Sequence, residues 1–337
     1  MSASADRIVT VTTVSDTVPD VERFLRRNLS TGVDHMVVFL DAERPDVQQV
    51  LEAHTRVSVV RTESGYWNHD RPTSLSERRM INANVSLTAL AHVPSVGWLF
   101  HIDTDEALAF DRDELLEMNS RAVQFRTLEA VAKLRGHEPE LFKTIPSVEE
   151  LHALAELGVI AEPELDSFFR GDHHGTTGVR PARDLRFRAH SVYELPELPI
   201  ETAHPPTMHL VRYGSWCLDD FVAHWQAFDP GATTDLPCDS LHIGTAFHTL
   251  SNHPALGKRE RRRCIAELFQ RHVADDIPVL QDFGLLVPDP LRRVEPRPLP
   301  QIDSRRLQEA LADLYAADKK PFRSNLPRVS DRPAGSR

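Results

Sequence analysis

The residues best suited to chemistry lie in one short stretch of the chain. An apolar run, Val96–Ile102, leads directly into a cluster of acids that comprises Asp103, Asp105 and Glu106. Carboxylates two residues apart at the end of a strand can converge on one divalent cation, because Mg²⁺ and Mn²⁺ prefer oxygen ligands. The alternative is that Asp103 or Asp105 only shapes the turn before a helix at residues 111–118. The strand and the third acid favour the metal site.

A second group lies on the helix that precedes this strand. Arg78 and Arg79 are adjacent, and Asn82 and Asn84 follow on the same helix. Arginine offers fixed pairs of donors to phosphate oxygens. The alternative is an ordinary solvated helix face.

The elements that position these residues alternate between strand and helix. Strands are predicted at Ile8–Val14, Met36–Leu40, Val57–Val60 and Val96–Ile102, with helices at Val21–Leu29, at Val47–Leu51 and from a Ser76 cap to Ala91. This order predicts an α/β fold with a mainly parallel sheet and right-handed crossovers. Ligands of such sheets bind beyond the carboxyl ends of the strands. Asp16, Asp41 and the acid cluster fall at those ends.

The remainder of the chain is less regular. We expect a fifth strand at Ala122–Phe125, a mostly helical segment at residues 131–169, a loop at Gly171–Gly178, short strands at Arg186–His190 and Met208–Val211, and helices at 219–228, 259–275 and 304–317. The polar end, residues 321–337, is predicted to be disordered.

Composition excludes several classes of protein. The 337 residues include 39 Lys and Arg against 50 Asp and Glu, a net charge of −11. This acid excess argues against non-specific binding of nucleic acids or anionic membranes, although a local basic pocket for phosphates is compatible with it. Three scattered cysteines are too few for a disulfide framework or a four-thiolate zinc site.

The chain also lacks the patterns of membrane insertion and export. No apolar run approaches the roughly 20 residues that span a bilayer. The first residues do not have the basic and then apolar order of a signal peptide. We therefore expect a soluble cytoplasmic protein without a transmembrane segment.

Four stretches resemble a known group of enzymes. Gly32–Asp41 resembles the start of the glycosyltransferase family 2-like group. Trp98 and the acid cluster match the Trp-x4-Asp-x-Asp-Glu pattern of variants allied to the family 92 transferases. Weaker similarity continues through Gly178–Pro181 with His190, and through Met208–Ser215. Where that group often carries Lys-Asn-Glu after the first strand, this chain has Val14-Ser15-Asp16.

The resemblance implies a GT-A fold and transfer of a sugar from a nucleotide-sugar donor to a hydroxyl group. The acceptor class is open: a glycan, a lipid-linked molecule or a small molecule. It implies that Asp105 and Asp103 hold Mn²⁺ or Mg²⁺ against the diphosphate leaving group, with His209 as a further ligand. Asp16 and Asp41 would line the donor site, Asp41 at the nucleobase, and Arg79 would add charge at the pyrophosphate.

An inverting transferase also needs a carboxylate to deprotonate the acceptor. Asp172 and Glu129 are the two predicted bases, and a solvated surface acid is the alternative for each. The catalytic domain is predicted at residues 1–290, with a helical insertion at 131–169 that contributes the acceptor region, and a Pro-rich extension at 291–337.

Two other functions remain open. One is a sugar-nucleotide nucleotidyltransferase, although the chain has no Gly-rich phosphate loop with a lysine near the first strand. The other is a catalytically silent GT-A-like module that binds a glycan or a protein. No nucleic-acid partner is expected.

Overall fold

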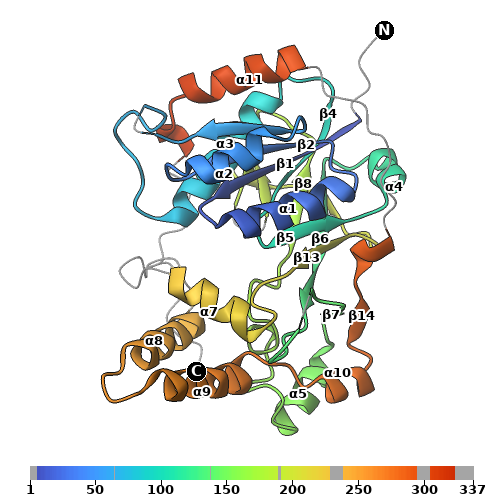
Figure 1. Ribbon diagram of the computed structural model, residues 1–337. Coiled ribbons are helices and arrows are strands. Elements are labelled where there is room, and N and C mark those ends of the chain that lie inside the picture. Colours follow the sequence, from blue (N-terminus) through green and yellow to red (C-terminus); the bar gives the residue numbers. More distant parts are fainter. Residues whose placement is uncertain are drawn as a thin grey trace.

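A mainly parallel, curled sheet organises the molecule (Figure 1). The computed structural model describes residues 6–63, 65–136, 138–188, 191–227, 238–293 and 304–322. Its first half comprises β1 (Arg7–Val14), α1 (Val18–Ser30), β2 (His35–Leu40), α2 (Pro45–Glu52), β3 (Val57–Arg61), α3 (Leu75–Leu90) and β4 (Val96–His101). Strands β4, β1, β2 and β3 are neighbours in that order and all parallel. The predicted alternation and the α/β class are confirmed.

Helices cover both faces of these strands. Alternate residues of β1 and β2 point to opposite faces. Val9 and Val37 pack in the cluster that includes α3 and α11 (Ser304–Ala316). Ile8 and Met36 pack in the cluster formed with α1 and α2. Because both faces are buried, β1 and β2 are apolar or β-branched almost throughout.

The sheet continues past β4 with mixed strand directions. The chain turns from β4 into β5 (Glu106–Ala109), and α4 (Arg112–Glu117) and β6 (Ala122–Ala130) follow. β8 (Thr176–Val179) lies antiparallel between β4 and β6. β13 (His209–Arg212) is antiparallel to β5 and parallel to β6. The smaller strands are β7 (Leu141–Lys143), β9 (Leu185–Phe187), β10 (Val192–Glu194), β11 (Leu198–Pro199), β12 (Thr202–Ala203) and β14 (Leu286–Pro288).

A helical part follows β13. It comprises α7 (Leu218–Ala227), α8 (Cys238–Asn252), α9 (Lys258–His272) and α10 (Ile277–Asp282). Aromatic side chains of α7, α8 and α9, among them Phe221, Phe247 and Phe269, form a separate core. The chain then returns to the other end of the molecule, where α11 lies over α3 (Figure 1). Two 3₁₀ turns, Pro290–Arg293 and Lys320–Phe322, flank this return.

The structure corrects the expectation for residues 131–169. Helix is confined there to α5 (Val148–Glu156) and α6 (Leu165–Phe168), and β7 occupies part of the segment. Pro146 precedes α5, and Gly158 ends it in a left-handed conformation with φ of +71°. The helical spacing of apolar residues in this segment therefore belongs to α5 alone.

Other differences are local. The cap of α3 is Ser74, whose hydroxyl accepts from the backbone N–H of Glu77, instead of Ser76. β5 and α8 are not among the elements predicted from the sequence. His190, Phe228 and the tail from residue 323 lie outside the described residues. Within the described part of the chain, no helix has the length and apolar character needed to cross a bilayer.

Candidate functional site

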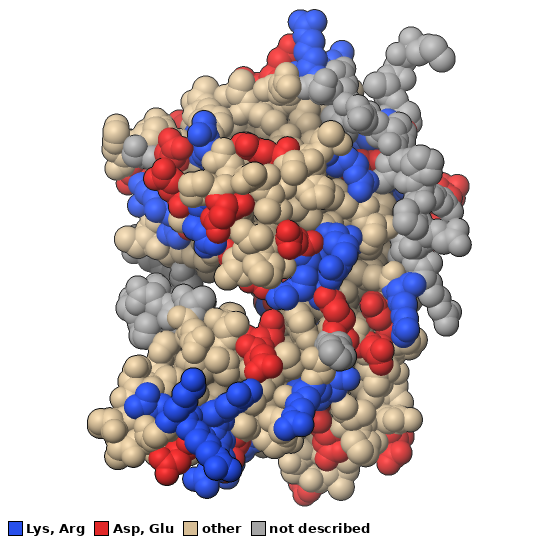
Figure 2. All heavy atoms as spheres, in the orientation of Figure 1, with Lys and Arg blue, Asp and Glu red and all other residues tan. Residues whose placement is uncertain are grey.

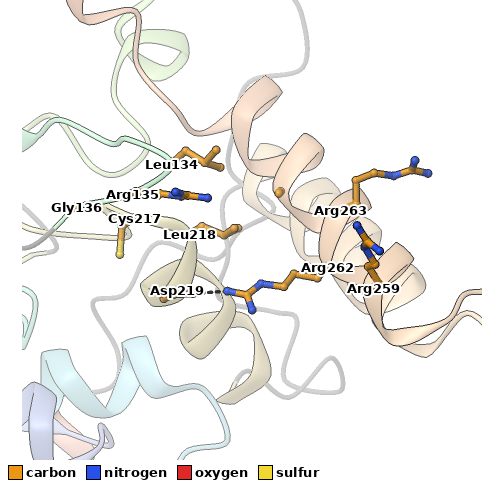
Figure 3. A pocket seen from close by; sticks show the side chains of 10 residues that line it. Leu134, Arg135, Gly136, Cys217, Leu218, Asp219, Arg259, Arg262 and Arg263 are labelled. Carbon is orange, nitrogen blue, oxygen red and sulfur yellow. Dashed lines mark ion pairs between the residues drawn. The ribbon is translucent and has the colours of Figure 1, made fainter.

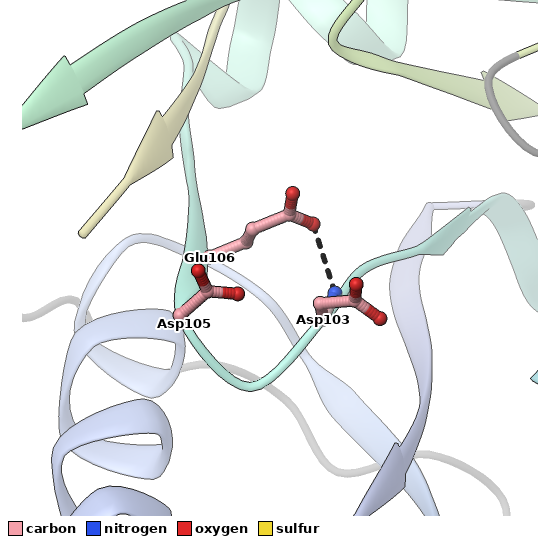
Figure 4. A group of neighbouring side chains, drawn as sticks. All are labelled: Asp103, Asp105 and Glu106. Carbon is pink, nitrogen blue, oxygen red and sulfur yellow. Dashed lines mark hydrogen bonds between the residues drawn. The ribbon is translucent and has the colours of Figure 1, made fainter. Parts of the chain in front are cut away.

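The turn between β4 and β5 gathers three carboxylates. Ligand oxygens of Asp103, Asp105 and Glu106 lie within 4.8 Å of one another (Figure 4). The Asp103 N–H donates to Oε2 of Glu106 at 2.8 Å, and the Glu106 N–H donates to the Asp103 carbonyl at 3.1 Å. These two hydrogen bonds close the turn, and the carboxylates of both aspartates lie close to that of the buried glutamate.

Glu106 is the buried member of this acid cluster. Burial raises its pKa to about 8, and the neighbouring charge of Asp103 adds to the effect. Close carboxylates that resist ionising together are the donor set that a divalent cation neutralises. The Asp105 side chain is 40% exposed and the Asp103 side chain 27%, so both aspartates can be reached from solvent. The residues present therefore fit a hard divalent cation.

Two arginines flank the acid cluster. Nη1 of Arg79, from α3, donates to Oδ2 of Asp103 at 3.1 Å. Nε of Arg212, from β13, lies 3.8 Å from Oδ2 of Asp105. The antiparallel register pairs Arg212 directly with Glu106, which explains its position. Sequence reasoning missed Arg212, and its only signal was its place at the end of the short Met208–Val211 strand.

The same register excludes His209 from the acid cluster. His209 pairs with Ala109, three residues along the strand from the Arg212–Glu106 pair. Three residues of strand span about 10 Å, and an odd separation reverses the face on which a side chain lies. The register therefore gives no support to the predicted role of His209 as a metal ligand. Burial lowers the pKa of His209, in keeping with a structural imidazole.

Asp16 and Asp41 lie at the predicted edge of the sheet but differ in their contacts. Oδ2 of Asp16 accepts from the Thr104 hydroxyl at 2.7 Å, which joins Asp16 to the turn that carries the acids. Burial raises the pKa of Asp16. Asp41 instead accepts two hydrogen bonds from Arg78, both at 2.7 Å, and pairs with Arg71 at 3.1 Å. Arginines thus already occupy both Asp41 oxygens. Nη1 of Arg78 also donates to the carbonyls of Pro72 and Thr73 at 2.9 and 2.7 Å, so four of the five N–H groups of this guanidinium are engaged.

A loop from Arg170 to His174 lies next to Arg212. Nη1 of Arg212 donates to the Asp172 carbonyl at 3.0 Å. Oδ1 of Asp172 accepts from the N–H of His174 at 2.7 Å and contacts its Nδ1 at 2.9 Å. One guanidinium therefore ties the predicted base, Asp172, to Asp105.

Glu129 holds this loop from behind. Its carboxylate accepts the backbone N–H groups of Arg170 and Gly171 at 3.0 and 3.1 Å, and pairs with Lys143 at 3.0 Å. Burial alone would raise the pKa of Glu129, but the charges of Arg170 and Lys143 outweigh it and lower the pKa to about 2. Only 3% of the side chain is exposed. A general base must reach its substrate, so Asp172 suits that role better than Glu129 does.

Comparisons with known proteins add little to this geometry. No protein-family model matches the chain, and a search of curated proteins finds no significant match. Among solved structures, the chain is similar to HddC from Yersinia pseudotuberculosis, with 10% identity and a TM-score of 0.31 over 64% of this chain and 96% of that one. The same protein complexed with GMP-PN gives 9% identity and a TM-score of 0.30 over the same shares of the two chains. TM-scores this low support no inference about fold or activity.

The structure thus brings together part of the predicted site. Asp16, Arg79, Asp103, Asp105 and Asp172 lie around the turn that carries the acids, joined by the contacts given above. Asp41 lies at the same edge in an arginine pair, Glu129 lies behind the loop, and His209 lies elsewhere. The arrangement can bind a divalent cation with carboxylates and a phosphate with arginines.

Proposed function

We propose that this protein is a metal-assisted glycosyltransferase that moves a sugar from a nucleotide-sugar donor to a hydroxyl-bearing acceptor. The observation that carries the proposal is the acid cluster with Arg79 and Arg212 on its two sides. A nucleotide-sugar loses a nucleoside diphosphate, and that leaving group needs both cationic charge and fixed donors.

Asp103 and Asp105 are the residues that would hold the cation, with Glu106 behind them. When bound, Mg²⁺ or Mn²⁺ supplies Lewis-acid stabilisation to the leaving diphosphate. Arg79 and Arg212 can exchange their carboxylate partners for phosphate oxygens, because guanidinium presents the same fork of donors to either. Their charge then opposes the negative charge that grows as the anomeric C–O bond breaks.

Asp172 is the proposed general base. The acceptor oxygen attacks the anomeric carbon, its proton passes to the Asp172 carboxylate, and the bond to the diphosphate breaks with inversion. The Arg212 contact to the Asp172 carbonyl keeps this base near Asp105 while its carboxylate stays 30% exposed.

The test is hydrolysis and transfer from a panel of nucleotide-sugars in the presence of Mn²⁺. Release of a nucleoside diphosphate, abolished by a chelator and reduced at least 100-fold in Asp172→Asn, supports the proposal. Wild-type rates under saturating chelator would contradict it. Formation of pyrophosphate from a nucleoside triphosphate and a sugar phosphate would indicate the nucleotidyltransferase instead.

One observation favours a second function, the silent binding module. Each aspartate of the acid cluster already pairs with an arginine, so two of its three carboxyl groups have a cationic partner without a metal ion. A protein that turns over no nucleotide-sugar of the panel but binds a glycan or a partner protein would be this module.

A further inference from the structure

A second cavity lies in the helical part of the molecule. Its volume is about 800 Å³, within the range of small-molecule sites. One wall is the loop that follows β6, at residues 134–136, and the opposite wall is the first half of α9 (Figure 3). Cys217 and the first turn of α7 close it between these walls. No residue of the proposed transfer site lines this cavity.

Arginines dominate the lining of this arginine cavity. Arg135 comes from the loop, and Arg259, Arg262 and Arg263 come from α9. Figure 2 shows a group of Lys and Arg side chains gathered over the region of α9. The whole chain has a net charge of −11, so this concentration of positive charge runs against the average of the surface.

The positive charge is poorly compensated. Among the described residues that line the cavity, Asp219 is the one carboxylate, and it lies 3.8 Å from Arg262, with both side chains at least 80% exposed. Arg263 pairs at 3.7 Å with Glu267 on its own helix. Within the described part of the chain, Arg135 and Arg259 have neither a carboxylate partner nor a side-chain hydrogen bond. Arg259, Arg262 and Arg263 occupy neighbouring positions of one helix, so their charges repel one another, and a bound anion would relieve that repulsion.

The rest of the lining is apolar. Leu134, which is 38% exposed, and Leu218 stand beside the arginines, with Ala266 on α9. A phosphate alone would leave this surface in water. A phosphate attached to an apolar group would use both kinds of wall.

We propose that the arginine cavity binds a phosphate ester whose organic part is at least partly apolar. Guanidinium forks recognise phosphate oxygens in pairs, and several arginines on one surface together attract anions. The ester can be a soluble phosphate or the headgroup of a lipid, since the charged chemistry is the same.

The cavity is close enough to the acid cluster to hold one end of an acceptor. The Tyr213 N–H donates to the Asp105 carbonyl at 2.8 Å. The backbone of Cys217, a cavity residue, pairs with that of Lys133 in an isolated β-bridge. Four residue steps separate Tyr213 from Cys217, which is no more than about 15 Å even for extended chain. This reading as an acceptor subsite rests on the proposed function, whereas the binding of a phosphate ester does not.

Cys217 allows the cavity to be tested without activity. In the full chain, with excess chelator and no donor, we would measure alkylation of Cys217 by mass spectrometry with increasing pyrophosphate. Saturating pyrophosphate should slow the reaction at least fivefold. Cys264, on α9 but outside the lining, serves as the internal control and should react at an unchanged rate.

Charge reversal locates the binding site. The double variant Arg259→Glu with Arg262→Glu should need at least tenfold more pyrophosphate for the same protection. The double variant Arg271→Glu with Arg305→Glu makes the same charge change at exposed positions outside the cavity lining, and should behave as wild type. Absence of protection, or equal protection in the double variant, would overturn the proposal.

Two further arms identify the source of the phosphate and separate the two proposals. Protection by soluble hexyl phosphate indicates a free ester, and protection only by vesicles containing phosphatidylglycerol indicates a lipid headgroup. In Asp105→Asn, protection should persist. Absence of sugar transfer by the wild type, with protection intact, contradicts the proposed function alone, while transfer by the wild type without any protection contradicts the cavity alone.

Discussion

Two buried glutamates, Glu106 and Glu129, illustrate how neighbours decide the chemistry of a side chain. Burial opposes ionisation of both carboxyls. Near Glu106 the Asp103 carboxylate adds to that opposition, and the pKa rises to about 8. Near Glu129 the charges of Arg170 and Lys143 reverse it, and the pKa falls to about 2. Glu129 therefore stays ionised and holds the loop that carries Asp172.

The first prediction concerns Glu129→Gln. This change leaves Lys143 and Arg170 buried with less compensation, so the free energy of unfolding at pH 7 should fall by about 3–5 kcal/mol. Because the folded pKa lies below the unfolded value, the contribution of Glu129 is complete above about pH 4.5 and is lost as the pH falls toward 2.

Urea unfolding of wild type and variant at a series of pH values checks this sign. The difference between the two proteins should shrink below pH 4.5. Glu22→Gln, an exposed position on α1, is the matched control and should change little. A difference that grows toward acid pH would contradict the assignment.

The second prediction concerns Gly171, next to Arg212. A Cβ on Gly171 would lie 2.5 Å from the Arg212 Cζ, and Arg212 is held by Asp105 and by the Asp172 carbonyl. Gly171→Ala should therefore displace either the guanidinium or the loop. We expect kcat for transfer to fall at least tenfold, with a loss of stability near 1 kcal/mol, since small shifts in reacting groups are costly.

Gly65→Ala is the matched control, because nothing lies within 4 Å of its added Cβ and its φ is not in the left-handed region. Its kinetics should stay at wild-type values. Equal kinetics for Gly171→Ala would remove Arg212 and the loop from the site.

At the scale of elements, the register of β13 decides which residue reaches the acids. Arg212 faces Glu106 and His209 faces Ala109. The third prediction is therefore a contrast between the two. Arg212→Met should weaken metal-assisted binding of a nucleoside diphosphate at least tenfold, because it removes a phosphate ligand. His209→Ala should leave that affinity within twofold of wild type.

Calorimetric titration of both variants with Mn²⁺ and nucleoside diphosphate measures this contrast. A tenfold loss in His209→Ala with none in Arg212→Met would reverse the assignment. Melting temperatures of the empty variants separate unfolding from loss of ligand contacts.

The parallel part of the fold could be predicted because its signals are local. β1, β2 and β4 are continuous apolar runs with acids at their carboxyl ends, and the order of strands and helices leaves few topologies. The pairing of β13 with β5 could not, because it joins segments about 100 residues apart and β5 is only four residues long. The prediction of His209 as a ligand and the omission of Arg212 follow from that one missing contact.

The role of Glu129 was hidden for a related reason. Its partners Lys143 and Arg170 come from two later segments of the chain, and both of them also pair with Asp275 from a third. The local sequence around an acid that follows a strand does not show whether its side chain is exposed to solvent or buried in a network of ion pairs. Asp41 shows the same limit. Arg71 and Arg78 are close to each other in the sequence, but the sequence alone does not show that both pair with Asp41.

At the scale of the whole molecule, two charged regions of opposite sign lie at the two ends of one short stretch of chain. The acid cluster belongs to the sheet, and the arginine cavity belongs to the helical part (Figure 1). Residues 213–217 run from one to the other. This arrangement suits a donor bound through metal and diphosphate at the sheet, with an anionic acceptor held by the helices.

Thermal unfolding with a panel of nucleoside diphosphates, with and without Mn²⁺, tests the central claim most directly. A ligand at 100 times its dissociation constant adds about 2.7 kcal/mol of stability. We predict that at least one nucleoside diphosphate raises the melting temperature of wild type only when Mn²⁺ is present. Asp105→Asn should lose this shift while its unliganded melting temperature stays near wild type, and Glu43→Gln, an exposed acid at the same edge of the sheet, should keep it. A shift that is absent for every nucleotide, or that persists unchanged in Asp105→Asn, would contradict a metal-assisted diphosphate site at the acid cluster.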